Sequence, residues 1–242
     1  ARGSARDGGL RRRRPPLRRS IQGGRPRSFG AADAEDPDHR RWISAIVKER
    51  VEGRRWVGRT NIEGDRQADL KHHGGPDKAV LAYAALHDPA WKRELPGVDL
   101  PAGAFGENLT VAGLTERDVA IGDVWTAGTV TFQVSQPRQP CWKLARRLGV
   151  PDMVVRVPDS LRTGWYFRVL DEGEIRAGVE LVLESRPHPR WSVAEAARVM
   201  FRHRGASDAA LELAELPALS TSWKRTLRLR AAGTDVDTTL RT

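Results

Sequence analysis

Apolar and polar residues alternate in short segments through the middle of the chain, and turns that contain glycine or aspartate separate them. Such alternation is typical of half-buried strands. The segments predicted to hold strands are residues 42–49, 51–57, 105–111, 119–125, 129–135, 164–170 and 179–183. The first two are close enough in sequence to form a hairpin. Short strands at this spacing indicate a barrel or a sandwich, so we expect a mainly β domain.

Helical patterns take over toward the C-terminus, after a proline-containing link at residues 186–190. Ser192 and Glu195 form a capping box ahead of an apolar-periodic run, which predicts a helix start. The three helices expected here begin at Ser192, Ser207 and either Ser220 or Ser222, and the third runs to about residue 230. Two shorter helices are predicted within the β region, over residues 88–95 and 142–148, the first with Asp88 as its N-cap.

These patterns divide the chain into three parts. Residues 1–28 are predicted to be a disordered, arginine-rich extension because they carry almost no apolar periodicity. Residues 29–186 form the mainly β domain, and residues 187–242 form a small three-helix domain with a disordered tail from about residue 231. Of the three interpretations of the extension, namely an RNA-binding arm, a transit peptide and a segment without function, we favour the last.

Charge argues against a nucleic-acid-binding domain. The chain carries a net charge of +10, but residues 1–28 hold ten arginines against one aspartate, which leaves only +1 for the rest. A nearly neutral domain lacks the basic surface of a nucleic-acid binder. We find no apolar run long enough to cross a membrane, no secretory signal, and a single cysteine, so we expect a cytoplasmic protein without disulfides.

The single cysteine, Cys141, lies in an unusual segment, SQPRQPCWKL at residues 135–144. Two prolines stiffen the approach to the thiol. Arg138 and Lys143 bring positive charge, which favours the thiolate form that attacks electrophiles and binds metals. A cysteine that is simply buried as a small apolar residue remains the alternative.

A polar loop at residues 60–78 contains the second candidate site. Gly74 and Gly75 lie between Lys71 and Lys78, and glycines expose backbone N–H groups that bind anions. This pattern predicts a phosphate cradle, and an ordinary turn is the alternative. The adjacent His72 and His73 are poorly spaced for zinc, which needs three or four ligands.

Further polar residues accompany glycines elsewhere: Glu107 and Asn108 follow Gly106, and Arg162 precedes Trp165 and Tyr166. Ordinary turn and core roles are the alternatives for both groups. The sequence lacks the Walker, GxSxG and GxGxxG signatures, which argues against a nucleotide or Rossmann dinucleotide site.

Six motifs occur in a fixed order along the chain: GDRQAD at 64–69, HGGPDKAV at 73–80, FGENL at 105–109, IGD at 121–123, SQPRQPCWKL at 135–144 and RTGWY at 162–166. Together they resemble the YiiM-like branch of the MOSC-domain proteins, which are named after the C-terminal domain of molybdenum-cofactor sulfurases. The three C-terminal helices resemble the small domain that follows MOSC in this branch. The resemblance covers nearly all of the chain from residue 41 on.

The resemblance implies a β-barrel-like fold with a pocket for the molybdenum cofactor, Mo-molybdopterin. It places the family's characteristic cysteine at Cys141, as a molybdenum ligand or a handler of sulfur. His73 and Glu107 are the matched positions that we expect to handle protons. The residues expected to hold the cofactor are Lys71, Gly74, Gly75, Lys78, Asn108, Arg138 and Arg162.

Two functions follow from the resemblance. The first is an enzyme that reduces N-hydroxylated small molecules, such as 6-hydroxylaminopurine, with electrons from a redox partner protein, since one cysteine cannot hold an iron–sulfur cluster. The second is a carrier of the cofactor, or of sulfur as a Cys141 persulfide, without turnover. Nucleic-acid binding through the arginine-rich extension is a weaker third alternative. A homodimer is one assembly that the sequence leaves open.

Overall fold

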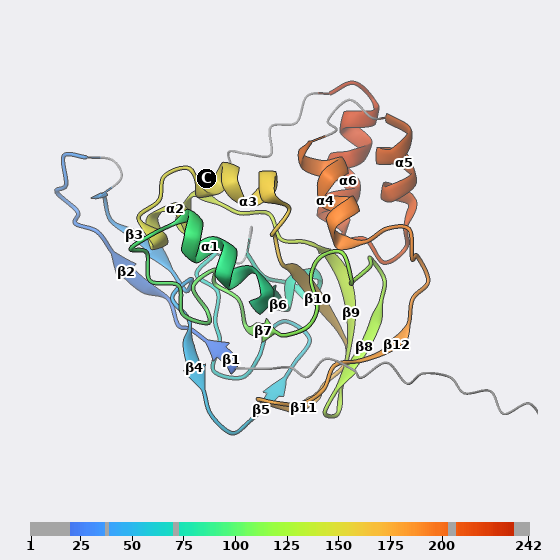
Figure 1. The fold of residues 1–242 in the computed structure, drawn as a ribbon, viewed down its shortest axis with the longest axis horizontal. Coiled ribbons are helices and arrows are strands. Elements are labelled where there is room, and N and C mark those ends of the chain that lie inside the picture. The colour runs from blue at the N-terminus through green and yellow to red at the C-terminus, as the bar shows by residue number, and fades with distance from the viewer. Residues whose placement is uncertain (1–19, 37–38, 70–72, 203–206, 235–242) are drawn as a thin grey trace, which may run out of the picture.

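The computed structural model describes residues 20–36, 39–69, 73–202 and 207–234 (Figure 1). Its centre is an eight-stranded sheet that curls into a half-barrel, with strand order β12-β8-β9-β10-β6-β7-β1-β4. All neighbours pair antiparallel except β6 and β7, which are parallel. The strands of this sheet are β1 (Ser20–Gly23), β4 (Glu49–Val51), β6 (Val80–Ala84), β7 (Leu109–Val111), β8 (Val124–Ala127), β9 (Val130–Pro137), β10 (Trp165–Asp171) and β12 (Val182–Ser185).

Two small sheets flank the half-barrel: β2 (Arg27–Phe29) pairs with β3 (Trp42–Ser44), and β5 (Arg54–Val57) pairs with β11 (Gly173–Arg176). Two short 3-10 turns, η2 (Pro76–Lys78) and η3 (Ala85–His87), border β6. The α-helices are α1 (Asp88–Glu94), α2 (Trp142–Leu148), α3 (Met153–Ser160), α4 (Val193–Phe201), α5 (Ser207–Glu215) and α6 (Thr221–Ala231). Among the described residues, no helix is both long and apolar enough to span a membrane.

The predicted hairpin of residues 42–49 and 51–57 is wrong. β4 pairs with β1, and β5 pairs with β11, so the two neighbouring strands belong to different sheets. Local alternation marks a strand but carries no information about its partner, which here lies more than a hundred residues away for β5.

The N-terminal boundary of the β domain also needs correction. Residues 20–23 and 27–29 form strands β1 and β2, although we expected disorder up to residue 28. β1 lies between β7 and β4, and the side chain of Ile21 is buried in the core. A four-residue strand is too short to show clear periodicity, so its burial is visible only in the fold. The rest of the predicted extension lies outside the described residues.

The helices α4 to α6 lie beside the half-barrel (Figure 1), and the two parts share one hydrophobic core. Phe132 and Val134 of β9 belong to the same buried cluster as Val193 of α4 and Trp223 of α6. Backbone hydrogen bonds reinforce the contact, because the N–H of Ile121 donates to the carbonyl of Trp191 at 2.8 Å. The three-helix domain is therefore packed on the sheet and not merely linked to it.

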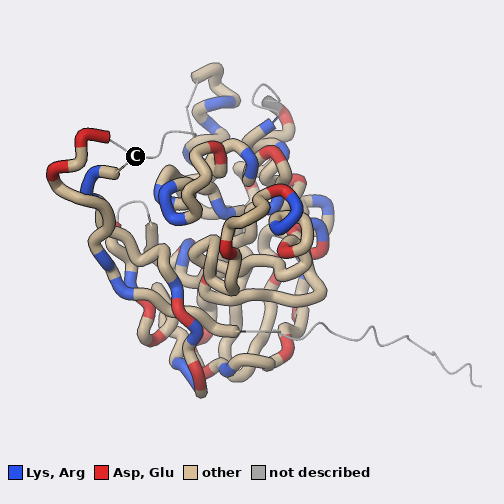
Figure 2. Tube along the Cα trace, turned by 60° about the vertical axis from the view of Figure 1, so that its left-hand side comes forward, with Lys and Arg blue, Asp and Glu red and all other residues tan. Residues whose placement is uncertain are grey.

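A second buried cluster lies beneath the helices α1, α2 and α3 and includes Tyr83, Trp91 and Phe105. It fixes the approach of α2 to the sheet, and α2 begins directly after Cys141. Lysine and arginine residues are interspersed with acidic residues along the described chain (Figure 2), in keeping with a nearly neutral domain.

Candidate functional site

A pocket opens where the ends of β3, β6 and β9 meet residues 65–69, 73–78 and 105–108. Its wall includes Cys141, which is the N-cap residue of α2 and only 5% exposed. The sharp passage from β9 through two prolines into α2 turns the cysteine toward the pocket. Within the described ranges, no group of three His, Cys, Asp or Glu side chains is arranged to hold a metal ion.

One wall of the pocket is cationic. It contains Lys78, Arg138 and Lys143 together with His73. Burial lowers the pKa of His73 from its ordinary 6.5 to about 4, and the charges of Lys143, Lys78 and Arg138 act in the same direction, opposed by Asp69. The imidazole is therefore neutral at pH 7. Such a wall is suited to an anionic ligand.

Arg138 gives the strongest sign that a ligand belongs in this pocket. Its side chain is buried, and its Nη2 donates to the carbonyl of Phe105 at 3.2 Å. Its buried Nη1 has no hydrogen-bond partner in the part of the chain that the structure describes. A buried charged donor without a partner is costly. A phosphate or another anion in the pocket would supply the missing acceptor.

Another part of the pocket lining, around Asp65 and Asn108, is polar, and its groups are already paired. Asp65 forms a buried ion pair with Lys48 and accepts hydrogen bonds from the N–H of Gly24 at 2.8 Å and from Asn108 Nδ2 at 2.9 Å. The Oδ1 of Asn108 accepts the N–H of Leu81 at 3.1 Å. Asn108 thus lines the pocket, but its amide is engaged in holding the strands together.

Gly74 and Gly75 shape the loop that carries the cationic residues. Their φ angles are 129° and 84°, in the region that favours glycine. Gly74 lines the pocket, whereas Gly75 lies just behind it, where its carbonyl accepts the N–H of Lys78 at 3.0 Å. Lys71, which we also predicted to contact the cofactor, lies outside the described residues.

Glu107 does not line the pocket, although its neighbours Gly106 and Asn108 do. Its buried carboxylate accepts hydrogen bonds from the N–H of Gly103 at 2.6 Å, the N–H of Phe105 at 3.1 Å and Thr110 Oγ1 at 3.1 Å. Burial raises the pKa of this carboxyl, and the hydrogen bonds oppose the rise. Glu107 therefore stabilises the turn beside the pocket, and the geometry does not support the proton-handling role that we predicted for it.

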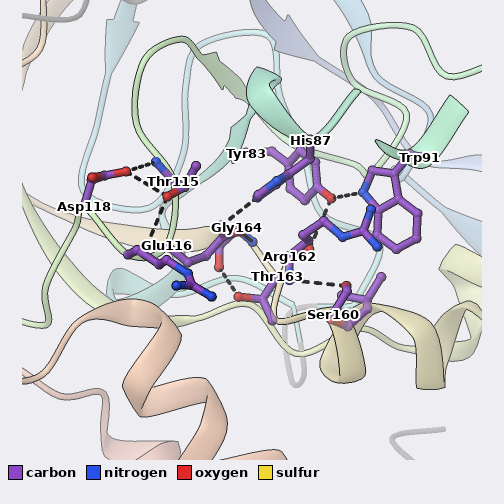
Figure 3. A network of polar contacts seen from close by, with 12 residues as sticks. Tyr83, His87, Trp91, Thr115, Glu116, Asp118, Ser160, Arg162, Thr163 and Gly164 are labelled. Atoms are coloured by element: carbon purple, nitrogen blue, oxygen red, sulfur yellow. Dashed lines mark hydrogen bonds and ion pairs between the residues drawn. The ribbon is translucent and has the colours of Figure 1, made fainter. Parts of the chain in front are cut away.

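Arg162 also lies away from the pocket. Its Nη2 donates to both carboxylate oxygens of Glu94 in α1, at 2.8 and 2.7 Å, and its guanidinium stacks 3.7 Å from the ring centre of Trp91 (Figure 3). The predicted contact with the cofactor is therefore not supported, because α1 provides the partner for this charge. A short motif does not reveal which distant element its arginine meets.

Several pocket residues had no assigned role in the sequence, and Tyr166 and Lys48 are two of them. Tyr166 of β10 lines the pocket, and burial raises the pKa of its hydroxyl. Lys48 also lines the pocket and pairs with Asp65. Tyr166 lies within the motif RTGWY, so its position in a motif was a usable signal. Lys48 belongs to none of the six motifs.

Comparisons with known proteins agree with this fold. Residues 69–182 match the MOSC domain, and residues 191–233 match the YiiM-like, 3-alpha helix domain. The protein YflK of Bacillus subtilis (strain 168) is 44% identical over 197 residues, which are 81% of this chain and 89% of YflK. A protein of Gibberella moniliformis named "Reductase" is 37% identical over 177 residues, which are 72% of this chain and 31% of that longer protein.

Among solved structures, YiiM from Geobacillus stearothermophilus superposes with a TM-score of 0.72 at 38% sequence identity, covering 88% of this chain and 97% of that protein. The matches thus include both domains, in this order, and they cover most of the chain. The chain belongs to the MOSC-domain family, in the group whose MOSC domain is followed by the YiiM-like three-helix domain.

Proposed function

We propose that this protein binds the molybdenum cofactor in the pocket and reduces N-hydroxylated small molecules there, with electrons from a redox partner protein. The observation that carries the proposal is the pairing of Cys141 with a cationic wall whose buried Arg138 Nη1 has no acceptor among the described residues. Membership of the MOSC family, which is associated with this cofactor, supports it. The name of the fungal relative supports the oxidoreductase class.

The residues present fit such a cofactor. The thiolate of Cys141 is a soft ligand suited to the metal. Arg138, Lys78 and Lys143 would bind the cofactor's phosphate through charge-assisted hydrogen bonds, and the loop at Gly74 lets the backbone approach it. When bound, the cofactor would supply a centre that exchanges two electrons.

Reduction of a hydroxylamine consumes two electrons and two protons, breaks the N–O bond, and releases an amine and water. His73 is the predicted proton-handling residue that lies in the pocket. Both protons come from solvent, and the neutral imidazole of His73 would relay one of them, donating its ring N–H proton to the leaving oxygen while its other ring nitrogen takes up a proton from solvent.

The test combines metal analysis with an assay. Protein from a molybdenum-replete host should contain molybdenum and reduce 6-hydroxylaminopurine with an artificial electron donor. Cys141→Ser should lower turnover by about 100-fold or more. Loss of a residue that only orients a metal ligand already lowers activity by about 10- to 100-fold, and loss of the ligand itself should lower it at least as much. Arg162→Lys is the matched control, since Arg162 lies outside the pocket and the variant should keep its molybdenum.

The outcomes separate the alternatives. Stoichiometric molybdenum without turnover of any N-hydroxylated compound would overturn the reductase and favour a carrier of the cofactor or of sulfur. Turnover unchanged in Cys141→Ser would overturn the role of the cysteine as metal ligand.

A further inference from the structure

The segment of residues 73–79, called the pocket loop below, is hydrogen-bonded to the three-helix domain through Asp77, which immediately precedes Lys78. One carboxylate oxygen of Asp77 accepts hydrogen bonds from Arg168 Nε at 2.9 Å and Arg168 Nη2 at 2.5 Å. The other oxygen accepts the backbone N–H of Thr221 at 3.1 Å, and Thr221 is the first residue of α6. The same side chain therefore joins the loop, the sheet and a helix of the C-terminal domain.

A second connection runs parallel to the first. The hydroxyl of Ser135 in β9 donates to the carbonyl of Asp77 at 2.5 Å. The carbonyl of Ser135 accepts the N–H of Ser220, the N-cap residue of α6, at 3.0 Å. β9 continues from Ser135 toward Arg138 and Cys141, so the start of α6 is hydrogen-bonded to both segments that form the cationic wall.

The loop needs such an anchor. Gly74 and Gly75 give it conformational freedom that the folded state must restrict at a cost in entropy. The ion pair of Asp77 with Arg168 is partly shielded from water, at 29% and 22% side-chain exposure, and Arg168 is held in turn by Gln133 at 2.6 Å. An anchor of this kind prepares the site for its ligand before binding.

We propose that Asp77 is a positioning residue through which the start of α6 holds the pocket loop in its anion-binding conformation. The proposal rests on the proposed function of the pocket and gives the three-helix domain a part in it. Deleting the domain would not test it, because its helices share the core of the half-barrel. Single substitutions at the contact are required.

Thr221→Pro removes the one N–H that Asp77 accepts from α6. Proline is well tolerated at the first position of a helix. The preceding Ser220 has φ −60° and ψ 147°, the extended conformation that a residue before proline prefers. Thr221→Ala is the matched control, since it loses the side chain and keeps the N–H. Asp77→Asn is a second variant, which keeps an acceptor but loses the charge that binds Arg168.

Two measurements are compared across these variants: hydrogen exchange of the amides in residues 73–79, and the affinity for inorganic pyrophosphate by calorimetry. Thr221→Pro loses one hydrogen bond to a carboxylate. Hydrogen exchange in the loop should therefore be faster, and the affinity for pyrophosphate should be about 10-fold lower, than in the wild type. Asp77→Asn should show the same changes, and Thr221→Ala should match the wild type.

Equal exchange and equal affinity in Thr221→Pro and Thr221→Ala would overturn the proposal. A wild-type protein that does not bind pyrophosphate would instead count against the anion site of the proposed function. The exchange rates of the loop would still decide the role of Asp77 in that case, because they require no ligand.

Discussion

At the scale of single residues, the lowered pKa of His73 makes the stability of the folded protein depend on pH. Its pKa is about 4 in the folded protein and 6.5 when exposed, so the unfolded chain binds the proton first as the pH falls. The contribution of neutral His73 to the free energy of unfolding is therefore complete above pH 6.5, and it is lost as the pH falls toward 4. We expect the free energy of unfolding to drop by up to about 3 kcal/mol over this range on account of His73 alone.

The comparison with His73→Gln isolates this effect, since carboxyl groups titrate equally in both proteins. Urea unfolding between pH 4.5 and 7.5 should show the wild type losing more stability than the variant as the pH falls. Parallel curves for the two proteins would mean that the pKa of His73 is not lowered in the folded protein.

The residue scale is also where prediction from the sequence was least complete. The ordered motifs identified the segments that form the pocket, and Cys141, His73, Gly74, Lys78, Arg138 and Asn108 all line it. The same motifs could not tell which side chains turn away. Glu107 binds the backbone of its own turn, and Arg162 meets α1. Side-chain direction within a loop depends on distant partners, which a motif does not contain.

At the scale of elements, Glu116 joins three parts of the fold that lie around the start of β10 (Figure 3). Its carboxylate lies 2.6 Å from His87 Nε2 and accepts the N–H of Gly164 at 2.6 Å. Its backbone carbonyl accepts the N–H of Ala194 in α4 at 2.8 Å. Gly164 in turn accepts the N–H of Arg138 at 3.0 Å, so this junction supports the pocket wall from behind.

We expect Glu116→Ala to lower the free energy of unfolding by about 3 kcal/mol or more, because it leaves His87 and a buried N–H without their acceptor. Glu116→Gln keeps an acceptor for Gly164 and should cost clearly less. Urea denaturation of the two variants at pH 7 measures the difference. Equal stability of the alanine and glutamine variants would show that the carboxylate is dispensable.

Elements with strong local signals were predicted well, and those defined by their partners were not. Helix α2 covers residues 142–148 as expected, and Ser192 caps α4 by accepting the N–H of Glu195 at 3.1 Å. The short helix α3, the strand β1 and the partners of β4 and β5 were missed. A helix forms its hydrogen bonds within itself, whereas a strand forms them with segments that may be far away in sequence.

At the scale of the whole molecule, the two domains recognised in the sequence share one hydrophobic core. The patterns correctly placed a β-rich part before a helical part. They could not show that Trp223 of α6 and Phe132 of β9 belong to one buried cluster. Contacts between faces of different elements are set by three-dimensional packing, which periodicity along one element does not reveal.

A shared core predicts that the protein unfolds in a single transition. The chain offers two independent probes: circular dichroism, to which the C-terminal helices contribute strongly, and reaction of the buried Cys141 with a thiol reagent, which reports the half-barrel. Their urea midpoints should coincide.

Trp223 is fully buried, so Trp223→Ala should lower both midpoints together, by about 3–5 kcal/mol in free energy of unfolding. Trp223→Phe keeps most of the volume and removes an indole N–H that has no partner within the described ranges, so its cost should be clearly smaller. A dichroism transition that shifts in Trp223→Ala while Cys141 stays protected would show that the helices unfold on their own, and the core would then be two cores.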